Sequence, residues 1–313
     1  MSLKFHIDFR KPKRLEAHQN GLIFNGTSDT AVLLIHGLTG TPNEMAFLSS
    51  FLSKNGFSVF SPRLANHGEP IGILKNSKWQ DFYGSVREAF IKIETTQKPK
   101  TIFVTGLCMG GLLALLLAHE FPDRISGVSC LAPTIFYDGW SVPWYSFFLP
   151  LAYYTPLKHF IYVKEDPPYG IKNETIRQRV HKYYSEADLN NIDSVAQYGY
   201  PYVPLTLLYQ QHLLANHVTK YLSSIRVPVQ LIHSKEDDTV SIKNSKFIHD
   251  RVGSEIKELI TLENSYHLIT VDYDRNMVAQ KMNDFFSQIE NRLTTERNDS
   301  MVETTVKLSK DTA

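Results

Sequence analysis

The stretch TIFVTGLCMGG, Thr101 to Gly111, predicts a buried strand, a sharp turn at Cys108 and the start of a helix. Its form is G-x-C-x-G-G, close to the G-x-S-x-G elbow, in which a nucleophile stands on a tight strand-to-helix turn. Such a turn lifts the reactive atom above the sheet and places it at a helix N-terminus, where the helix dipole favours an anion. Cysteine is also among the most frequently buried residues, so an inert core thiol is the alternative interpretation.

Strands and helices alternate on both sides of this stretch, which predicts a parallel sheet with helices on both faces. The alternation runs through residues 30–133, stops, and resumes over 226–293. The segment between them, 134–225, is aromatic, irregular and contains prolines, and we expect it to form an inserted cap or lid. Residues 1–29 are expected to form an N-terminal segment, and the polar residues 294–313 a disordered tail.

The composition excludes several classes of function. The 313 residues are 42% hydrophobic and carry a formal net charge of +1, so no long-range field attracts nucleic acid. The only two cysteines, Cys108 and Cys130, lie in no metal-binding or disulfide spacing, so we expect neither a metal site nor a disulfide scaffold. The N-terminus has basic residues but no apolar signal-peptide core, which predicts a cytoplasmic location.

Residues 139–157 contain no charged side chain, as a membrane-spanning helix would, and so they test the expectation of a cytoplasmic location. Three prolines would break a membrane-spanning helix there, so we expect no stable membrane insertion and interpret the segment as a lid or pocket wall. Contact with a membrane surface is the lesser alternative. Four aromatic residues of the segment are candidates to line an apolar pocket, although any one of them can equally fill the core of the cap: Trp140, Trp144, Tyr145 and Phe148.

A second stretch, IHGLTG, places His36 and Gly37 at the end of a strand. The loop that follows can aim the backbone N–H of Leu38 at a developing oxyanion, joined by the N–H of Met109 after the elbow cysteine. His36 is a candidate pocket residue. The alternative is that HG is only a turn and His36 a loop histidine with its hydrogen bonds satisfied.

Two further stretches supply acids and a base. A strand ends in LIHSKEDD, which carries Asp237 and Asp238, and the later stretch LENSYH ends on His267. The chain order is therefore cysteine, acid, histidine, the order of nucleophile, acid and base in hydrolases with this elbow. In such a site the base reaches the nucleophile, while the acid holds the base in the correct tautomer.

Taken together, HGLTG, RLANHG, WQD, GLCMGG, EDDTV and SYH make the chain resemble the α/β-hydrolase superfamily, in particular its bacterial carboxylesterase and monoacylglycerol-lipase-like branch. The resemblance covers about residues 30–133 and 226–290. It implies a mostly parallel eight-stranded sheet with an inserted helical cap, a catalytic triad and acyl chemistry without a cofactor. The family pattern G-x-x-D-x-x-V, laid on HSKEDDTVSIKNS, places the triad acid at Asp237, with Asp238 as the alternative.

The cysteine in the nucleophile position departs from the family pattern, although dienelactone hydrolases and polyhydroxyalkanoate synthases carry one there. Three interpretations of Cys108 are therefore open. It is a working nucleophile, it belongs to a site that binds a ligand without turnover, or it is an inert core residue. A working Cys108 forms a thioester acyl-enzyme. We therefore expect an acyl hydrolase for esters, thioesters or lactones. Its substrate would be a small apolar or aromatic acyl compound, with an acyl-thioester as one candidate donor. The alternatives are an acyltransferase with an amine or alcohol acceptor and a non-catalytic ligand-binding homologue.

Overall fold

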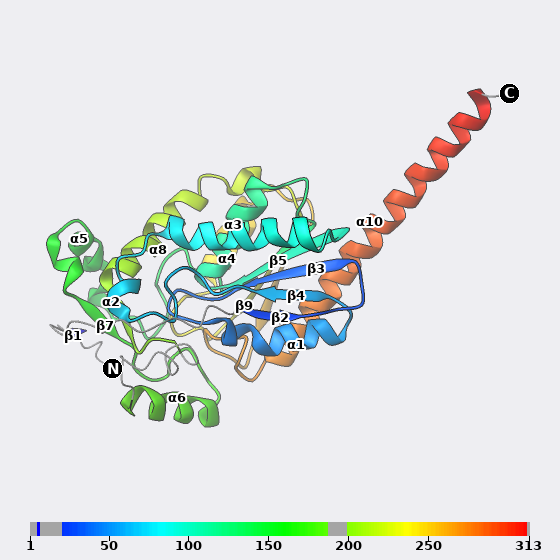
Figure 1. The fold of residues 1–313 in the computed structure, drawn as a ribbon. Coiled ribbons are helices and arrows are strands. Elements are labelled where there is room, and N and C mark those ends of the chain that lie inside the picture. The colour runs from blue at the N-terminus through cyan, green and yellow to red at the C-terminus, as the bar shows by residue number, and fades with distance from the viewer. Residues whose placement is uncertain (1–4, 7–20, 187–198, 312–313) are drawn as a thin grey trace.

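The computed structural model describes residues 5–6, 21–186 and 199–311. Its centre is a twisted sheet in the order β10-β9-β6-β5-β3-β4-β2, in which every strand is parallel to its neighbours except β2 (Figure 1). The strands are β2 Leu22–Phe24, β3 Thr30–Ile35, β4 Ser58–Ser61, β5 Thr101–Leu107, β6 Gly127–Leu131, β9 Val229–Ser234 and β10 Lys257–Leu262.

The strands of the sheet centre are buried along their whole length. Every residue of β3, β5, β6 and β9 is buried, as expected for parallel strands covered on both faces. Over the described residues the sheet has seven strands, one fewer than expected from the resemblance. β2 is its last strand on one side, and residues 7–20, which precede β2, lie outside the described part of the chain.

Helices cover both faces of the sheet, as the alternating pattern predicts, and form two apolar clusters with it. One cluster includes α3, α4 and α8, and the other includes α1 and the first part of α10. α4 is buried on nearly all sides because it lies between the sheet and its helical neighbours. The helices are α1 Ala46–Lys54, α2 Ile71–Leu74, α3 Trp79–Thr96, α4 Met109–Glu120, α8 Leu205–Val218, α9 Lys243–Arg251 and α10 Arg275–Asp311.

Between β6 and β9 the chain forms an insertion, which lies on the side of the sheet away from the end of α10 (Figure 1). It contains a small antiparallel sheet in which β7 pairs with β8 and with the N-terminal β1. α8, within the expected cap range, contacts α3 and α4 and so belongs to the helical layer over the sheet. The other elements are β1 Phe5–His6, α5 Leu149–Tyr153, β7 Tyr162–Lys164, α6 Glu174–Glu186 and β8 Tyr202–Pro204, with short 3-10 turns at Pro42–Met45, Trp144–Phe148, Pro156–His159 and Leu222–Ser224.

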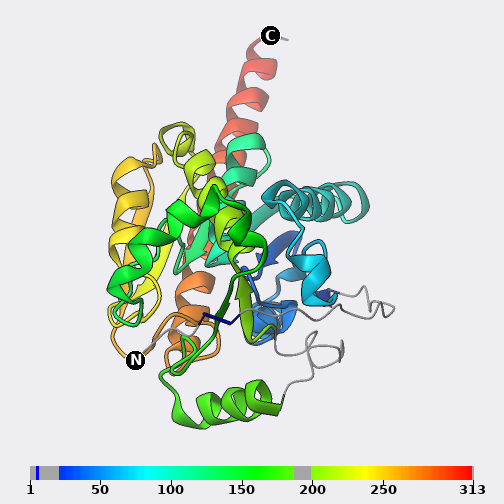
Figure 2. The same ribbon diagram turned by 90° about the vertical axis from the view of Figure 1, so that its left-hand side faces the viewer.

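The polar segment from residue 294, for which we expected disorder, continues α10 as a helix to Asp311. Residues 294–311 contain neither glycine nor proline, so no residue in the segment terminates the helix. Both views show these last turns extending away from the rest of the molecule (Figures 1 and 2). Among the described residues, no helix combines the length and the apolar character needed to cross a bilayer.

Candidate active site

Cys108 stands between β5 and α4 in a backbone conformation that few side chains adopt. Its φ is 55° and its ψ −115°, in the positive-φ region that costs a non-glycine residue free energy. The backbone N–H of Cys108 donates to the Leu131 carbonyl of the neighbouring strand at 2.9 Å, which fixes the turn to the sheet. The stretch therefore forms the predicted strand, sharp turn and helix, with the cysteine at the apex.

The glycines of the stretch are required by close backbone contacts. A Cβ on Gly106 would lie 2.0 Å from the carbonyl carbon of Gly110, and a Cβ on Gly110 would lie 2.3 Å from the Ile35 carbonyl oxygen. Both neighbours are backbone atoms, which cannot rotate away as a flexible side chain can. The spacing G-x-C-x-G thus allows β3, β5 and α4 to meet beneath Cys108.

A Gly110→Ala substitution is expected to destabilise the fold by about 3 kcal/mol or more, because the added methyl group would overlap backbone in a closely packed region. Gly84 in α3 is the matched control: nothing lies within 4 Å of a Cβ placed there. Gly84→Ala is expected to stabilise the protein by about 0.5–1 kcal/mol, since alanine is a better helix former than glycine. Urea unfolding measures both changes, and similar unfolding midpoints for the two variants would contradict the prediction.

The acid and the histidine meet at the carboxyl ends of β9 and β10. The Nδ1 atom of His267 lies 2.8 Å from Oδ2 of Asp237, and both residues are buried. The other oxygen of Asp237, Oδ1, accepts hydrogen bonds from the backbone N–H groups of Thr239 (2.9 Å) and Val240 (2.7 Å). His233 also approaches Oδ2 of Asp237, with its Nε2 at 3.2 Å. This network holds the carboxylate in one orientation toward the His267 ring.

Asp238 has a different set of partners. Its Oδ2 accepts a hydrogen bond from the backbone N–H of Gly170 in the insertion (3.1 Å), and its Oδ1 accepts one from the backbone N–H of His267 (3.4 Å). No hydrogen bond of Asp238 to the His267 ring is present among the described residues. Of the two adjacent acids, the one favoured by the family pattern is therefore the one that contacts the imidazole.

The charges of this pair favour an ionised acid and a protonated histidine. Burial opposes ionisation of Asp237, but the His267 charge, with hydrogen bonds from His233 and His267, holds the pKa of the carboxyl well below its usual range. Burial likewise lowers the pKa of His267, but the Asp237 carboxylate and then Cys108 outweigh it and raise that pKa well above its usual range. Such an imidazole readily keeps a proton taken from a neighbouring thiol.

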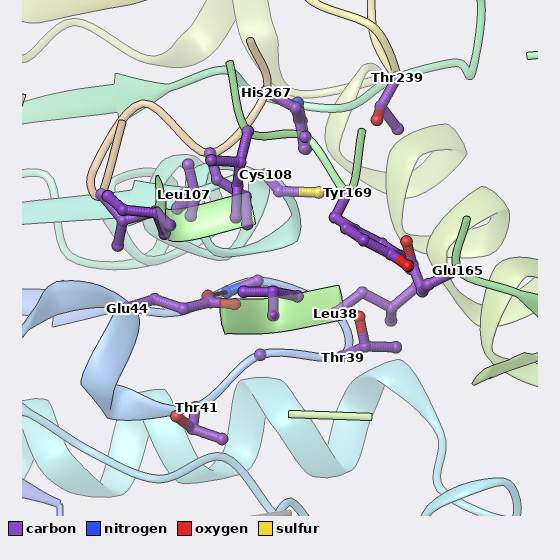
Figure 3. A pocket seen from close by; sticks show the side chains of 18 of the residues that line it. Leu38, Thr39, Thr41, Glu44, Leu107, Cys108, Glu165, Tyr169, Thr239 and His267 are labelled. Atoms are coloured by element: carbon purple, nitrogen blue, oxygen red, sulfur yellow. Dashed lines mark hydrogen bonds between the residues drawn. The ribbon is translucent and has the colours of Figure 1, made fainter. Parts of the chain in front are cut away.

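Cys108 and His267 line one cavity of about 780 Å³, and residues of the insertion form part of its wall (Figure 3). Tyr137, Glu165 and Tyr169 come from the insertion. The volume is within the range of pockets that hold small organic ligands. The cysteine is only 8% exposed, so a substrate reaches it through this cavity.

The predicted oxyanion donors lie beside the cysteine. Leu38 lines the cavity, and Met109 is the first residue of α4, so its N–H has no acceptor within the helix. Two side chains fix the Leu38 loop: the buried His67 donates from Nε2 to the Leu38 carbonyl (2.8 Å), and the partly buried Glu44 accepts from the Gly37 N–H (3.2 Å). The role of the two N–H groups remains a prediction, but the backbone positions it requires are present.

The candidate pocket residues are not confirmed. His36 is completely buried and lies outside the cavity lining: its Nδ1 contacts the Gly37 carbonyl (2.9 Å), and its Nε2 accepts from the Leu64 N–H (3.2 Å). The side chains of Trp140, Trp144 and Phe148 are 58%, 78% and 51% exposed and line neither cavity found between the core and the insertion. The side chain of Tyr145 lies outside the described part of the structure.

Two acids that the sequence analysis did not single out line the cavity instead. Glu44 follows β3, and Glu165 follows β7 in the insertion. Burial raises the pKa of each to about 7, and for Glu165 the nearby Asp238 carboxylate contributes in the same direction. Glu44 stands three residues after Thr41, the N-cap of the turn Pro42–Met45, so its sequence pattern indicates only the start of a helix. Glu165 lies in no recognisable motif. No local pattern in the sequence therefore marks either acid as a cavity residue.

Glu165→Gln is expected to stabilise the protein at pH 8 but not at pH 4. The pKa of Glu165 rises from 4.5 to about 7 on folding, so the folded state binds the proton more tightly. Its contribution to stability is therefore fully present below about pH 4.5 and is lost as the pH rises through 7. Removing the charge recovers at most about 3 kcal/mol. Urea unfolding at both pH values measures the gain. Glu88→Gln, at an exposed position in α3, is the control. An equal gain in unfolding free energy at both pH values for Glu165→Gln would contradict the prediction.

The parallel sheet, the elbow and the acid and histidine at neighbouring strand ends define the class of the protein: it is an enzyme of the α/β-hydrolase type. The family described as serine aminopeptidase, S33, matches residues 26–274, and the chain belongs to this family. The family description names a serine, whereas the apex of the elbow in this chain is Cys108.

Individual relatives agree with this assignment. The chain is 32% identical over 259 residues to a thermostable monoacylglycerol lipase from Bacillus sp. (strain H-257). The aligned region covers 82% of this chain and 90% of the relative. It is 23% identical over 262 residues to a carboxylesterase from Bacillus subtilis (strain 168), covering 84% of this chain and 94% of the relative. The crystal structure of a monoacylglycerol lipase from Paleococcus ferrophilus superposes with a TM-score of 0.70 at 19% identity, over 88% of this chain and 100% of the other, and so shares the fold.

Proposed function

We propose that the protein hydrolyses carboxylic esters through Cys108, with monoacylglycerols as the first substrates to test. The observation that carries the proposal is the contact between His267 Nδ1 and the buried Asp237 Oδ2 at 2.8 Å, together with the cavity that His267 and Cys108 both line. The relatives described above are named as a monoacylglycerol lipase and a carboxylesterase, and both names denote ester hydrolysis. The monoacylglycerol is suggested by the name of the relative with 32% identity.

In the proposed reaction, the Cys108 thiol gives its proton to Nε2 of His267, and the sulfur attacks the ester carbonyl carbon. The carbonyl electron pair moves to the oxygen, which accepts hydrogen bonds from the N–H groups of Leu38 and Met109. When the pair returns, the carbon–oxygen bond to the alcohol breaks, and His267 protonates the departing oxygen. Water then attacks the thioester with His267 as its base, which releases the acid and the free thiol. Asp237 orients the imidazole throughout.

The cysteine favours a second candidate. A thioester transfers its acyl group to amines, alcohols and thiols as well as to water, so acyl transfer shares the first half of this reaction and differs only in the acceptor. Thioesters and lactones are further donors that fit the same chemistry.

The experiment follows the acyl group on the protein. Wild-type protein is mixed with monoacylglycerols, p-nitrophenyl esters and acyl-thioesters, and intact mass is recorded alongside product release. We expect an acyl adduct on Cys108 that decays in water, and retention of the adduct in Cys130→Ala, the variant lacking the only other cysteine. An adduct that persists in water but discharges to added amine or alcohol would select acyl transfer.

The absence of an adduct, together with equal product release by wild type and Cys108→Ala, would rule out both catalytic proposals. The non-catalytic alternative would then remain. Rapid hydrolysis of the thioester does not obscure the result, because the difference in product release between the two proteins still reports the chemistry of Cys108.

A further inference from the structure

The turn after β6 brings a hydroxyl group to the candidate nucleophile. Thr134 Oγ1 lies 3.0 Å from Cys108 Sγ, and Thr134 is completely buried. The only other hydrogen bond of this hydroxyl among the described residues is to the Ala132 carbonyl, at 3.4 Å. For comparison, the thiol of Cys130 contacts its acceptor, the Gly111 carbonyl, at 3.6 Å. The short contact to Cys108 is thus the principal interaction of the threonine side chain.

The backbone of this turn is strained. Ala132 has a φ of 42°, a conformation that L-residues adopt at a cost, and its N–H is held by the Ile232 carbonyl at 2.9 Å. The turn also lies very close to α4, since a Cβ on Gly111 would be 3.2 Å from Cβ of Pro133. Gly111, the last glycine of the G-x-C-x-G-G stretch, therefore lets the turn approach the cysteine.

Two buried amide side chains fix the turn from outside. Gln211 in α8 donates from Nε2 to the Thr134 carbonyl at 2.7 Å. Oδ1 of Asn244 in α9 accepts from the backbone N–H groups of Ile135 and Phe136, each at 2.8 Å. The backbone strain at Ala132, the close approach of the turn to α4 and these three hydrogen bonds together fix the turn. They place the Thr134 hydroxyl beside the Cys108 sulfur.

We propose that Thr134 is a positioning residue that donates its hydroxyl hydrogen to the Cys108 sulfur and stabilises the thiolate before the substrate is attacked. The inference rests on the proposed function of Cys108 as a nucleophile. When the thiol proton moves to Nε2 of His267, the sulfur becomes a strong hydrogen-bond acceptor, whereas a neutral thiol is a weak donor and a weak acceptor. The Thr134 proton stays on its oxygen throughout.

The same hydroxyl has a second acceptor for the next step. Once the sulfur has bonded to the acyl carbon it carries no charge, and the hydroxyl can turn to the Ala132 carbonyl, 3.4 Å away. Thr134 therefore favours the thiolate over the thioester.

The charged groups around the sulfur make such a donor useful. His267 faces it from the loop after β10, and its positive charge favours the thiolate. Glu44, after β3, and Glu165, in the insertion, line the same cavity, and their carboxylates oppose a second negative charge. Tyr137 also faces the sulfur, and burial, with a smaller contribution from Cys108, raises the pKa of its phenol. A neutral hydroxyl stabilises the anion without adding charge to the cavity.

The test measures the reactivity of Cys108 against pH in the absence of an acyl substrate. Alkylation by iodoacetamide is followed by intact mass in a Cys130→Ala background, so that a single thiol is counted. Thr134→Val removes the hydroxyl and keeps the shape of the side chain, and Thr134→Ser keeps the hydroxyl. We expect the midpoint of the pH–rate profile to rise by about one to two pH units in Thr134→Val and to stay near the wild-type value in Thr134→Ser.

Profiles of wild type and Thr134→Val that superimpose would overturn the inference, and so would a shift to lower pH, which would mean that the thiol donates to the threonine. Thr134→Ala repeats the measurement if the valine variant unfolds. The outcome is separable from that of the proposed function: a shifted profile in a protein that releases no product would leave the inference standing and remove the hydrolase proposal. An unshifted profile in an active enzyme would remove only the inference.

Discussion

Cys108→Ala is expected to lower kcat/KM for ester hydrolysis by about 10³-fold or more. Removal of a nucleophile eliminates the covalent route and leaves only the rate enhancement from binding and from the oxyanion donors. Because Cys108 is a small buried side chain, alanine leaves little empty volume, and the variant is expected to fold. The measurement is initial-rate release of p-nitrophenol from a short-chain ester, with circular dichroism to verify folding.

Cys130→Ala is the control for this prediction. Cys130 lies in β6, is completely buried, and burial raises the pKa of its thiol far above the usual range, so it cannot serve as a thiolate nucleophile near neutral pH. We expect this variant to keep kcat/KM within a few-fold of wild type, at some cost in stability. Equal activity of Cys108→Ala and wild type would mean that the reaction proceeds without the elbow cysteine.

The core of the fold was predictable because each of its signals is local. The buried runs of β3, β5, β6 and β9 read as parallel strands, and the glycines around Cys108 mark backbone contacts that no side chain fits. The positions of the cysteine, acid and histidine also follow from local patterns at strand ends. The carboxyl ends of parallel strands lie at one edge of the sheet, and each of these three motifs follows the end of a strand. The sequence therefore predicts that the cysteine, the acid and the histidine lie close together.

The walls of the cavity were not predictable in the same way. Residues 139–157 have no regular period, so nothing in the sequence tells which side chains face the core, and Trp140 and Trp144 are exposed instead. Glu165 and Tyr169 reach the cavity only because the insertion folds back over the sheet. Thr134 contacts Cys108 across 26 positions of sequence through a strained turn, which no motif describes.

Asp237→Asn is expected to lower kcat/KM by about 10³-fold, whereas Asp238→Asn is expected to lower it less than tenfold. The asparagine at 237 cannot carry the negative charge that stabilises the imidazolium, and its NH₂ group competes for the Nδ1 atom of His267 and favours the wrong tautomer. The two N–H groups of Thr239 and Val240 direct one oxygen of residue 237 away from His267, so the amide nitrogen takes the place of Oδ2 beside Nδ1.

Asp238 is the matched control because it is the same residue type, one position away and equally buried. Burial and then the Asp237 charge raise its pKa to about 6, so a neutral asparagine resembles the protonated form that it already adopts in mildly acidic solution. The backbone N–H of Gly170 still finds an oxygen acceptor there after side-chain rotation, which preserves the contact to the insertion. Kinetics of both variants at pH 7, with urea unfolding of each, separate loss of chemistry from loss of stability. A larger kinetic defect in Asp238→Asn than in Asp237→Asn would assign the acid of the triad to Asp238, and the 2.8 Å contact between Asp237 and His267 would then be structural.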